Sequence, residues 1–365
     1  MSIRHSQFYR LATIFVALML GLTAPFSAIP NPVAQQERKT SGFAFPAQYV
    51  SQTAPEEPYS VSKRARVFAL IPLGERILAV GSRGLALVSD SLNGEMWSSV
   101  ALPAAPNLYA GLEDSSGRVW LASDAGQLYS GNAELKSWSK VDLQEDSSVY
   151  AITELTGGSL IAVGQYGLIK MKTVGSEEWK TVDLPWDEWL QSAWQQFGEA
   201  MPHLFGTCHS GTSLFVVGEF GLVLKYDGRR WVRLHGGSIE PALYSCATRE
   251  EQLIVVGQRG AMLRSTDAGE TWSANYVSSS SIYKVVALPG DNWLAVGEER
   301  QIWWVEKPDS VWKCGRVDTA ATGWFVDALL SPQGKLVTLA GAGVLRSLKL
   351  DNSDAPILPK AFACG

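Results

Sequence analysis

Histidines, nucleophiles and phosphate-binding loops would be the simplest source of chemistry in this chain, and their spacing supports none of it. The histidines form neither an HxH nor an HExxH pattern, so a metal or histidine-base site is not indicated. The sequence also lacks a Walker loop and a GxSxG element, which would mark a phosphate-binding loop or a serine nucleophile. We therefore predict no catalytic residue, no metal site and no cofactor.

The cysteines leave two alternatives open. Their wide spacing, with no CxxC pair, makes a zinc site a poor interpretation; they are Cys208, Cys246, Cys314 and Cys364. In an exported protein an even number of cysteines can form disulfides, and a bridge between Cys314 and Cys364 would tether the C-terminus. The alternative is four small buried side chains.

Three markers recur in phase along the chain and predict a repeat protein. Tryptophans lie at intervals of about 40 residues, with one longer gap: Trp97, Trp138, Trp179, Trp231, Trp272 and Trp312. Upstream of each lies a glycine-bounded turn, such as AVGSRG (79–84) or VVGQRG (255–260). An aromatic residue opens each of the seven units: Phe68, Tyr109, Tyr150, Phe205, Tyr244, Tyr283 and Phe325.

The length and content of the repeat indicate its architecture. Short runs rich in Val, Ile and Leu alternate with Gly, Asp, Asn and Ser clusters, which is typical of short strands. A unit of about 40 residues accommodates four such strands, the content of one propeller blade. The sequence therefore predicts an all-β, seven-bladed β-propeller with four-stranded blades, in which the run before each glycine turn is a buried middle strand and the turn glycines supply positive φ.

The seventh unit has no closing tryptophan strand, and the segment Gly42–Val50 is predicted to close the ring by supplying it. The tail Ile357–Cys364 is the alternative. An N-terminal strand would cover the open edge of the last blade. The predicted boundaries are a signal peptide over 1–28, a linker over 29–41, the propeller over 42–350 and a C-terminal tail over 351–365.

The one long gap between tryptophans contains an insertion, residues 186–201, that is predicted to be helical. Its apolar residues follow the spacing of one helix face, and that face includes Trp186, Trp189 and Trp194. The stripe either packs on the propeller or forms a docking ridge for a partner, since tryptophan is enriched in interface anchors.

The N-terminus predicts export. Arg4 and Arg10 flank a short polar start, and the apolar stretch Leu11–Ala24 follows, which is the layout of a secretory signal peptide and is short for a membrane span. Cleavage is expected after Ala28, although Phe26 departs from the small-residue rule. We expect a periplasmic protein. An uncleaved leader or the partner would be what holds it at the membrane. The formal charge of −5 and the absence of a basic run exclude a nucleic-acid footprint.

The string STDAGETW (Ser265–Trp272) resembles the Asp-box of BNR-repeat propellers, a structural turn between the last two strands of a blade. The repeated region as a whole, about Arg66 to Leu350, resembles the photosystem II assembly/stability factor-like family, as in VVGQRGAMLRSTDAGETW (255–272). The resemblance implies that the chain is a non-photosynthetic bacterial relative of this family. It also implies an exported propeller that serves a membrane protein complex and presents arginines to it. Arg83 and Arg259 occupy equivalent turns, Arg300 a related one, and Gln165 and Glu219 are expected at similar places in other blades.

Sialidases share the Asp-box, so a glycosidase is the alternative function. That chemistry needs an arginine trio, a Tyr–Glu pair and an acid, or two facing carboxylates such as Glu154 and Asp327. The Arg-Ile-Pro element of sialidases is absent; Leu70-Ile71-Pro72 lacks the arginine. We therefore expect a non-enzymatic, monomeric binding protein for a membrane complex, such as a transporter, or for its exported loops and termini. No small-molecule substrate is predicted.

Overall fold

The computed structural model describes residues 66–94, 96–236, 240–307, 310–316, 323–351 and 355–356. The chain divides into two compact units, Met1–Ser60 and Val61–Gly365, and all described residues lie in the second. The predicted signal peptide, the linker, the strand Gly42–Val50 and the tail from Ile357 lie outside the described residues.

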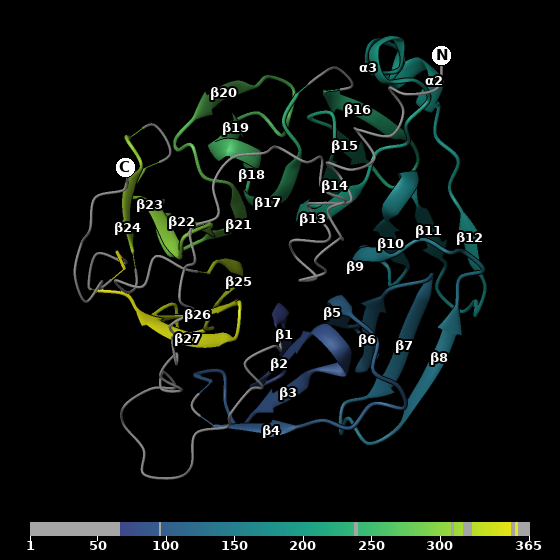
Figure 1. Cartoon of the computed structure of the whole chain (residues 1–365), viewed down its shortest axis with the longest axis vertical. Helices are drawn as coiled ribbons and strands as arrows, with labels where there is room; N and C mark the ends of the chain where they lie inside the picture. The colour runs from purple at the N-terminus through teal and green to yellow at the C-terminus, as the bar shows by residue number, and fades with distance from the viewer. Residues whose placement is uncertain are drawn as a thin grey trace, which may run out of the picture. The chain divides into compact units, whose positions relative to one another are not determined.

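The second unit is a seven-bladed β-propeller, which confirms the predicted fold. Seven antiparallel sheets follow one another in a ring (Figure 1). The innermost strands contact each other in succession, and β25 of the last blade returns to β1 of the first. Among the described residues the first six blades have four strands each and the seventh has three.

Each blade is an up-and-down sheet. Blade 1 comprises β1 (Val67–Leu73), β2 (Arg76–Gly81), β3 (Ala86–Ser89) and β4 (Trp97–Ser99). Blade 2 comprises β5 (Leu108–Glu113), β6 (Arg118–Ser123), β7 (Gln127–Asn132) and β8 (Trp138–Asp142). Blade 3 comprises β9 (Val149–Glu154), β10 (Leu160–Gly164), β11 (Ile169–Lys172) and β12 (Trp179–Thr181). Blade 4 comprises β13 (Leu204–Ser210), β14 (Ser213–Gly218), β15 (Val223–Tyr226) and β16 (Trp231–His235).

The remaining blades repeat this pattern. Blade 5 comprises β17 (Leu243–Arg249), β18 (Gln252–Gly257), β19 (Ala261–Ser265) and β20 (Ser273–Tyr276). Blade 6 comprises β21 (Ile282–Ala287), β22 (Trp293–Gly297), β23 (Gln301–Val305) and β24 (Lys313–Arg316). Blade 7 comprises β25 (Phe325–Leu330), β26 (Leu336–Gly341) and β27 (Val344–Lys349). The repeated tryptophans begin the outermost strands or directly precede them, as the repeat predicted.

The core lies between neighbouring blades. The second strand of each blade is buried on both faces, as in β10 (LIAVG) and β14 (SLFVVG), so its apolar run packs against the blade on either side. One interblade cluster joins Ile161 and Val163 of blade 3 to Leu204 and Val216 of blade 4. The fold therefore holds its blades together by face-to-face apolar packing.

A glycine ends the second strand in six blades, with Ser123 in its place in blade 2, and at two of these glycines the reason differs from our expectation. Gly81 and Gly164 are extended, with φ of −173° each, so the predicted positive φ is wrong for them. A Cβ at Gly81 would lie 1.8 Å from the Arg66 carbonyl oxygen, and one at Gly164 would lie 2.0 Å from that of Ser148. Only glycine permits this close approach of two backbones. The second glycine, where a turn has one, does have positive φ, as at Gly84 (73°).

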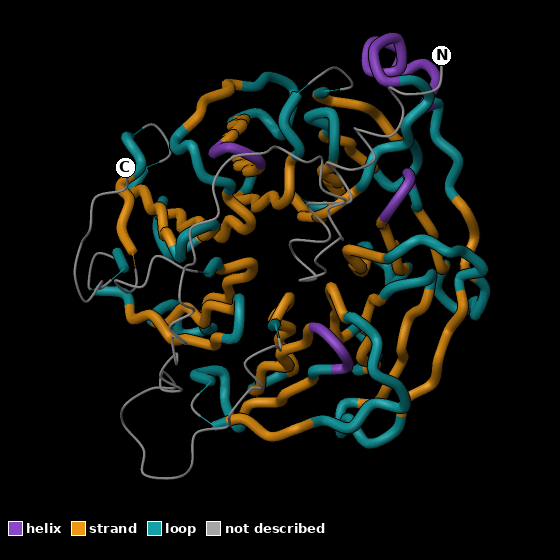
Figure 2. Tube along the Cα trace, viewed as in Figure 1, coloured by secondary structure: helices purple, strands orange, loops and turns teal. Residues whose placement is uncertain are grey.

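Two short helices replace the single helix predicted over 186–201. They are α2 (Trp186–Trp189) and α3 (Gln191–Phe197), and they lie between blades 3 and 4 (Figure 2). Leu190, with φ −109° and ψ 10°, interrupts the helix, and Gly198 ends it with φ 77°, a left-handed conformation that commonly terminates helices. Among the described residues no helix is long and apolar enough to cross a bilayer.

Candidate binding face

The predicted partner-binding arginines and the helical insertion lie at the same end of the propeller. Because strands alternate in direction, the turn from the second to the third strand and the connection from the fourth strand to the next blade emerge at the same end of every blade. We call this end the turn face. The turns that carry Arg83, Arg259 and Arg300 lie there, and so does the α2–α3 insertion, which joins β12 to β13.

A left-handed residue stands at the third position of each of these turns. In six blades that residue is not glycine: Arg83 (φ 56°), Ala125 (50°), Tyr166 (53°), Phe220 (58°), Arg259 (55°) and Glu299 (55°). Blade 7 has Gly343 instead, with φ 65°. The left-handed conformation costs an L-residue about 1–2 kcal/mol, and glycine would avoid that cost. Strained side chains thus recur at one position of the turn face, and clusters of such residues are found at functional sites. Leu135, Glu250 and Ala268 are left-handed as well, in turns at the opposite end of the propeller.

The three predicted arginines differ in their surroundings. Arg83 and Arg259 are exposed, and neither forms an ion pair with a carboxylate of a described residue. Arg300 is half-buried and left-handed (φ 55°), at the position where Gly84 and Gly260 stand in other blades. Structure and topology place all three on the turn face, while their contact with a partner stays a prediction.

The expectation that Gln165 and Glu219 stand at the arginine position is wrong by one residue. Both occupy the second position of the turn, and their side chains accept hydrogen bonds from backbone amides: Gln165 from Ser148 N at 2.9 Å and Glu219 from His203 N at 2.9 Å. They fasten the turn to the residue that precedes the innermost strand of the same blade. The side chains equivalent to Arg83 in blades 3 and 4 are Tyr166 and Phe220, which sequence reasoning missed.

Aromatic rings on six inner strands form a series, called the collar here, at the strand ends nearest the turn face. Each inner strand carries a β-bulge after its first residue, and in six blades the bulged residue is aromatic. Successive ring centroids are 5.8, 5.3, 5.6, 5.4 and 5.7 Å apart; the rings are Phe68, Tyr109, Tyr150, Phe205, Tyr244 and Tyr283. The seventh bulge is Val326, because Phe325 is the residue before it and is fully buried in the core. The unit marker at Phe325 was therefore one residue out of phase.

The tyrosines of the collar are held neutral. Burial raises the pKa of Tyr109, Tyr150 and Tyr244 well above the usual range for a phenol. Tyr283 donates a hydrogen bond to Glu298 Oε1 at 3.0 Å, and burial together with that carboxylate raises its pKa as well. Tyr283 and Glu298 form the kind of pair that sialidase chemistry uses, but a raised pKa opposes the tyrosinate that would attack a sugar.

The two candidate carboxylates do not form a catalytic pair. Glu154 is the last residue of β9 and accepts hydrogen bonds from Ser115 N (2.8 Å) and Oγ (2.5 Å). Asp327 is the third residue of β25, is buried, and pairs with Lys284 Nζ at 2.9 Å. They belong to different levels of the channel wall and are each engaged by neighbouring blades. In the part of the chain that the structure describes, no cluster of three metal-binding side chains occurs.

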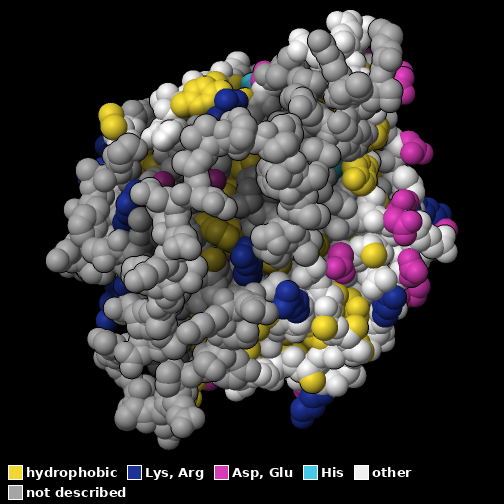
Figure 3. Space-filling model, in the orientation of Figure 1, with side chains coloured by type: hydrophobic (Ala, Val, Ile, Leu, Met, Phe, Trp, Pro, Cys, Tyr) yellow, Lys and Arg dark blue, Asp and Glu magenta, His cyan; other side chains and the backbone are white. Residues whose placement is uncertain are grey.

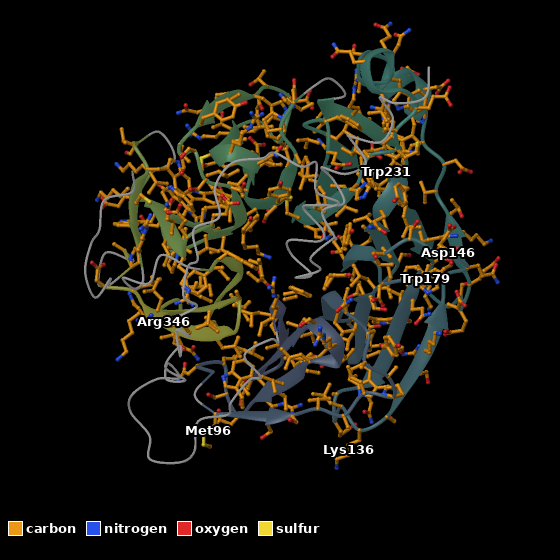
Figure 4. The ribbon with its side chains drawn as sticks, in the orientation of Figure 1. Met96, Lys136, Asp146, Trp179, Trp231 and Arg346 are labelled. Carbon is orange, nitrogen blue, oxygen red and sulfur yellow. A yellow bond between two sulfur atoms is a disulfide. The ribbon has the colours of Figure 1, made fainter. Side chains whose placement is uncertain are left out.

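The insertion packs its tryptophan stripe on the propeller. Trp186 and Trp189 are 9% and 8% exposed, and their rings meet edge to face at 5.9 Å. Trp194 is half-buried, and its Nε1 donates to the Ala200 carbonyl at 3.0 Å. These rings join the cluster between blades 3 and 4, against which Trp231 of the outermost strand also packs (Figure 4). Trp186 and Trp189 are packed on the propeller, as one of the two alternatives expected. Contact of the three tryptophans with a partner stays a prediction.

The exposed Tyr166 is joined to the collar through a buried histidine. Its ring meets His203 edge to face at 5.0 Å, and His203 stacks on Tyr150 at 6.3 Å. His203 Nδ1 lies 3.1 Å from Glu219 Oε2, in the turn that carries Phe220. His203 therefore connects the turns of blades 3 and 4. The signal that could have found Tyr166 was its alignment with Arg83 in the repeat.

Three of the four cysteines are disulfide-bonded in the described residues, which settles the open alternative for them. Cys208 of β13 and Cys246 of β17 are bridged, with 5.7 Å between their Cα atoms, so the inner strands of blades 4 and 5 are covalently joined. Cys314 is also disulfide-bonded, and Cys364 lies outside the described residues. The Cys314–Cys364 bridge thus stays a prediction.

Comparison with known proteins supports the fold. No protein family model and no curated protein sequence matches the chain. A structure of YCF48 bound to D1 peptide is 14% identical, with a TM-score of 0.62, over 82% of this chain and 97% of that one. Streptogramin B lyase is 12% identical, with a TM-score of 0.66, over 78% and 93%. The WD40 propeller of Doa1 is 10% identical, with a TM-score of 0.61, over 80% and 95%. Because binding proteins and an enzyme share this architecture at such low identity, the likeness shows the propeller fold alone.

Proposed function

We propose that this chain is a non-enzymatic, exported binding protein whose turn face docks on a protein partner. The observation that carries the proposal is the set of strained, non-glycine residues on that face. Glycine would be less strained at those positions, and Ala125 shows that the turn forms without a long side chain. What supports binding is therefore the arginine and aromatic side chains that four of these strained positions display on one face. Arginine and tyrosine are also the residue types that most often anchor protein interfaces.

The partner we propose is a membrane protein complex, such as a transporter, or its exported loops and termini. The predicted signal peptide supports export to the periplasm, where a monomer held by its partner or by an uncleaved leader would meet such a complex. The resemblance of the repeat to assembly and stability factors supports an accessory role. The YCF48 structure with its D1 peptide supports the idea that a propeller of this shape can hold a peptide.

The left-handed positions allow a test that keeps the fold intact. Arg83→Gly and Arg259→Gly together remove both exposed guanidinium groups, and because glycine accepts positive φ, the free energy of unfolding should stay the same or rise by up to about 1 kcal/mol. In-cell crosslinking of the tagged chain, followed by mass spectrometry of native membranes, should recover one membrane complex. The double variant should recover about tenfold less, which corresponds to a loss of about 1.4 kcal/mol.

Ala125→Gly is the matched control, because it makes the same backbone change where no functional side chain exists. It should recover as much of the complex as the unchanged chain. The proposal fails if the unchanged chain recovers no protein partner, or if the arginine double variant captures as much as the control.

A further inference from the structure

We infer that the C-terminal segment of this chain is a redox-controlled latch, in which Cys364 forms a disulfide with Cys314 and holds the last blade of the ring to blade 6. We call residues 357–364 the latch. The inference goes beyond the proposed function, because it concerns how the ring is fastened and not what the propeller binds.

The bonded state of Cys314 is the first observation. Cys314 is the second residue of β24, the outermost strand of blade 6, and it is disulfide-bonded. The chain has four cysteines, and Cys208 and Cys246 are bonded to each other. The partner that remains for Cys314 within the chain is therefore Cys364.

The turn that follows β27 is the second observation. The Asp351 amide donates a hydrogen bond to the Ala355 carbonyl at 2.8 Å, and the Ala355 amide donates to Asp351 Oδ1 at 3.0 Å. Leu350 forms an antiparallel bridge with Pro356. The latch thus begins at a fixed point of blade 7, at the end of the propeller opposite the turn face.

The two ends of the latch meet the propeller near the same end of the ring. β24 runs from the end opposite the turn face towards the turn face, so Cys314 lies close to its start. Cys364 follows Pro356 by eight residues. Eight extended residues span at most about 29 Å, whereas packed sheets are about 10 Å apart. The latch is therefore long enough to cross from blade 7 to the rim of blade 6.

A fourth strand of blade 7 is the competing position for this segment, and the register opposes it. A strand that continued from Pro356 along β27 would run towards the turn face and carry Cys364 past Val344, away from Cys314. Pro359 would then stand opposite Ser347 in a hydrogen-bonded pair, where proline has no N–H to donate. Both consequences favour the latch.

The latch would fasten the last blade at the rim. All three strands of blade 7 lie between Cys314 and Cys364, so the bond closes a loop that contains every described strand of the blade. At the channel, blade 7 is already held on both sides. Asp327 pairs with Lys284 of blade 6 at 2.9 Å and accepts a hydrogen bond from the Leu70 amide of blade 1 at 2.7 Å.

The rim position makes the latch bond more accessible than the Cys208–Cys246 bond. Cys246 is 6% exposed on an inner strand, whereas Cys314 is half-buried on an outermost strand and follows the exposed Lys313. Figure 3 shows lysine and arginine side chains along the left-hand edge of the molecule, where blades 6 and 7 stand in Figure 1. Since thiol–disulfide exchange requires access to a sulfur, a reductant should open the latch first.

The exchange is balanced by a dithiol. One of its thiolates attacks a sulfur of the latch bond, and its second thiol resolves the mixed disulfide. Two electrons and two protons pass to Cys314 and Cys364, and the reductant leaves as a disulfide. A disulfide oxidant reverses the exchange, so the latch should close in an oxidising compartment.

The test begins with the connectivity of the full chain, purified without reductant and with its free thiols blocked. Trypsin should release fragments 314–316 and 361–365 as one disulfide-linked species, detected by mass spectrometry. The inference is overturned if fragment 314–316 is unlinked or is linked to a fragment that contains Cys208 or Cys246.

Variants then test the action of the latch. In oxidising buffer Cys314→Ser with Cys364→Ser should lower the urea midpoint by about 1 M, and reducing buffer should abolish the difference. In the unchanged chain, dithiothreitol followed by alkylation should open the latch about tenfold faster than the Cys208–Cys246 bond. Cys208→Ala with Cys246→Ala is the matched control, in which the latch should open at an unchanged rate. Equal opening rates of the two bonds, or an unchanged midpoint of the serine variant, would show that the segment does not act as a latch.

Discussion

At the scale of single residues, the turn face displays side chains that stand on a left-handed backbone, among them Arg83, Tyr166 and Phe220. Arg83 and Arg259 were identifiable because two blades share the string GxRG. Tyr166 and Phe220 were missed because the preceding residues, Gln165 and Glu219, were aligned with the arginines instead. What distinguishes them is the left-handed backbone at Tyr166 and Phe220. That conformation is rare for bulky residues, so no local pattern predicts it without the closed turn that enforces it.

Asp267 offers a pH-dependent prediction at this scale. Hydrogen bonds from the Thr271 hydroxyl and amide lower the pKa of its carboxyl from 3.8 to about 2. A carboxyl whose pKa is lower in the folded state stabilises the fold above its unfolded pKa, and this stabilisation is lost as the pH falls through the folded value. The urea midpoint of the unchanged chain should therefore fall between about pH 4 and pH 2 more steeply than that of Asp267→Asn. Parallel curves would contradict the role given to these hydrogen bonds.

At the scale of elements, strands were predictable and the insertion was only partly so. The apolar runs before each glycine are long enough and sufficiently β-branched to specify buried strands. The helical spacing of the insertion was also correct, but its break at Leu190 was not, since no proline or glycine marks it. The chain bends there because Trp186 and Trp189 follow the surface between blades 3 and 4, and tertiary packing outweighs helix propensity.

Trp189→Ala tests whether the insertion is part of the core. Removal of a buried tryptophan side chain should lower the free energy of unfolding by about 3–5 kcal/mol, measured by urea denaturation. Gln195→Ala, on an exposed position of α3, should change it by less than about 0.5 kcal/mol. Equal effects of the two substitutions would show that the helices are an appendage rather than a support.

At the scale of the whole molecule, the repeat determines the blade number, and the ring brings distant segments together. The tryptophans, the glycine turns and the aromatic residues that open the units were together sufficient for the fold. The Cys208–Cys246 bridge was not predictable from cysteine spacing alone, because the pairing depends on which inner strands are neighbours in the ring. The carboxylates Glu154 and Asp327 are no facing pair, because one ends its inner strand and the other is the third residue of its own.

The bridge makes a prediction about the stability of the ring. Replacement of Cys208 and Cys246 by alanine opens a covalent loop of 38 residues of sequence separation and should cost about 2–4 kcal/mol, measured by urea unfolding under oxidising conditions. Under reducing conditions the difference between the two chains should vanish. A variant as stable as the unchanged chain in oxidising buffer would show that packing alone holds blades 4 and 5.

The left-handed turn position is interchangeable from blade to blade. Six side chains as different as those of Ala125, Glu299 and Phe220 occupy one backbone geometry, so the identity of the side chain and the construction of the turn are decoupled. Exchange of Arg83 with Ala125 would leave composition and fold unchanged and rotate a positive charge by one blade around the axis. The chain can thus acquire a new partner by exchanging side chains among these turn positions, while every blade keeps its structure.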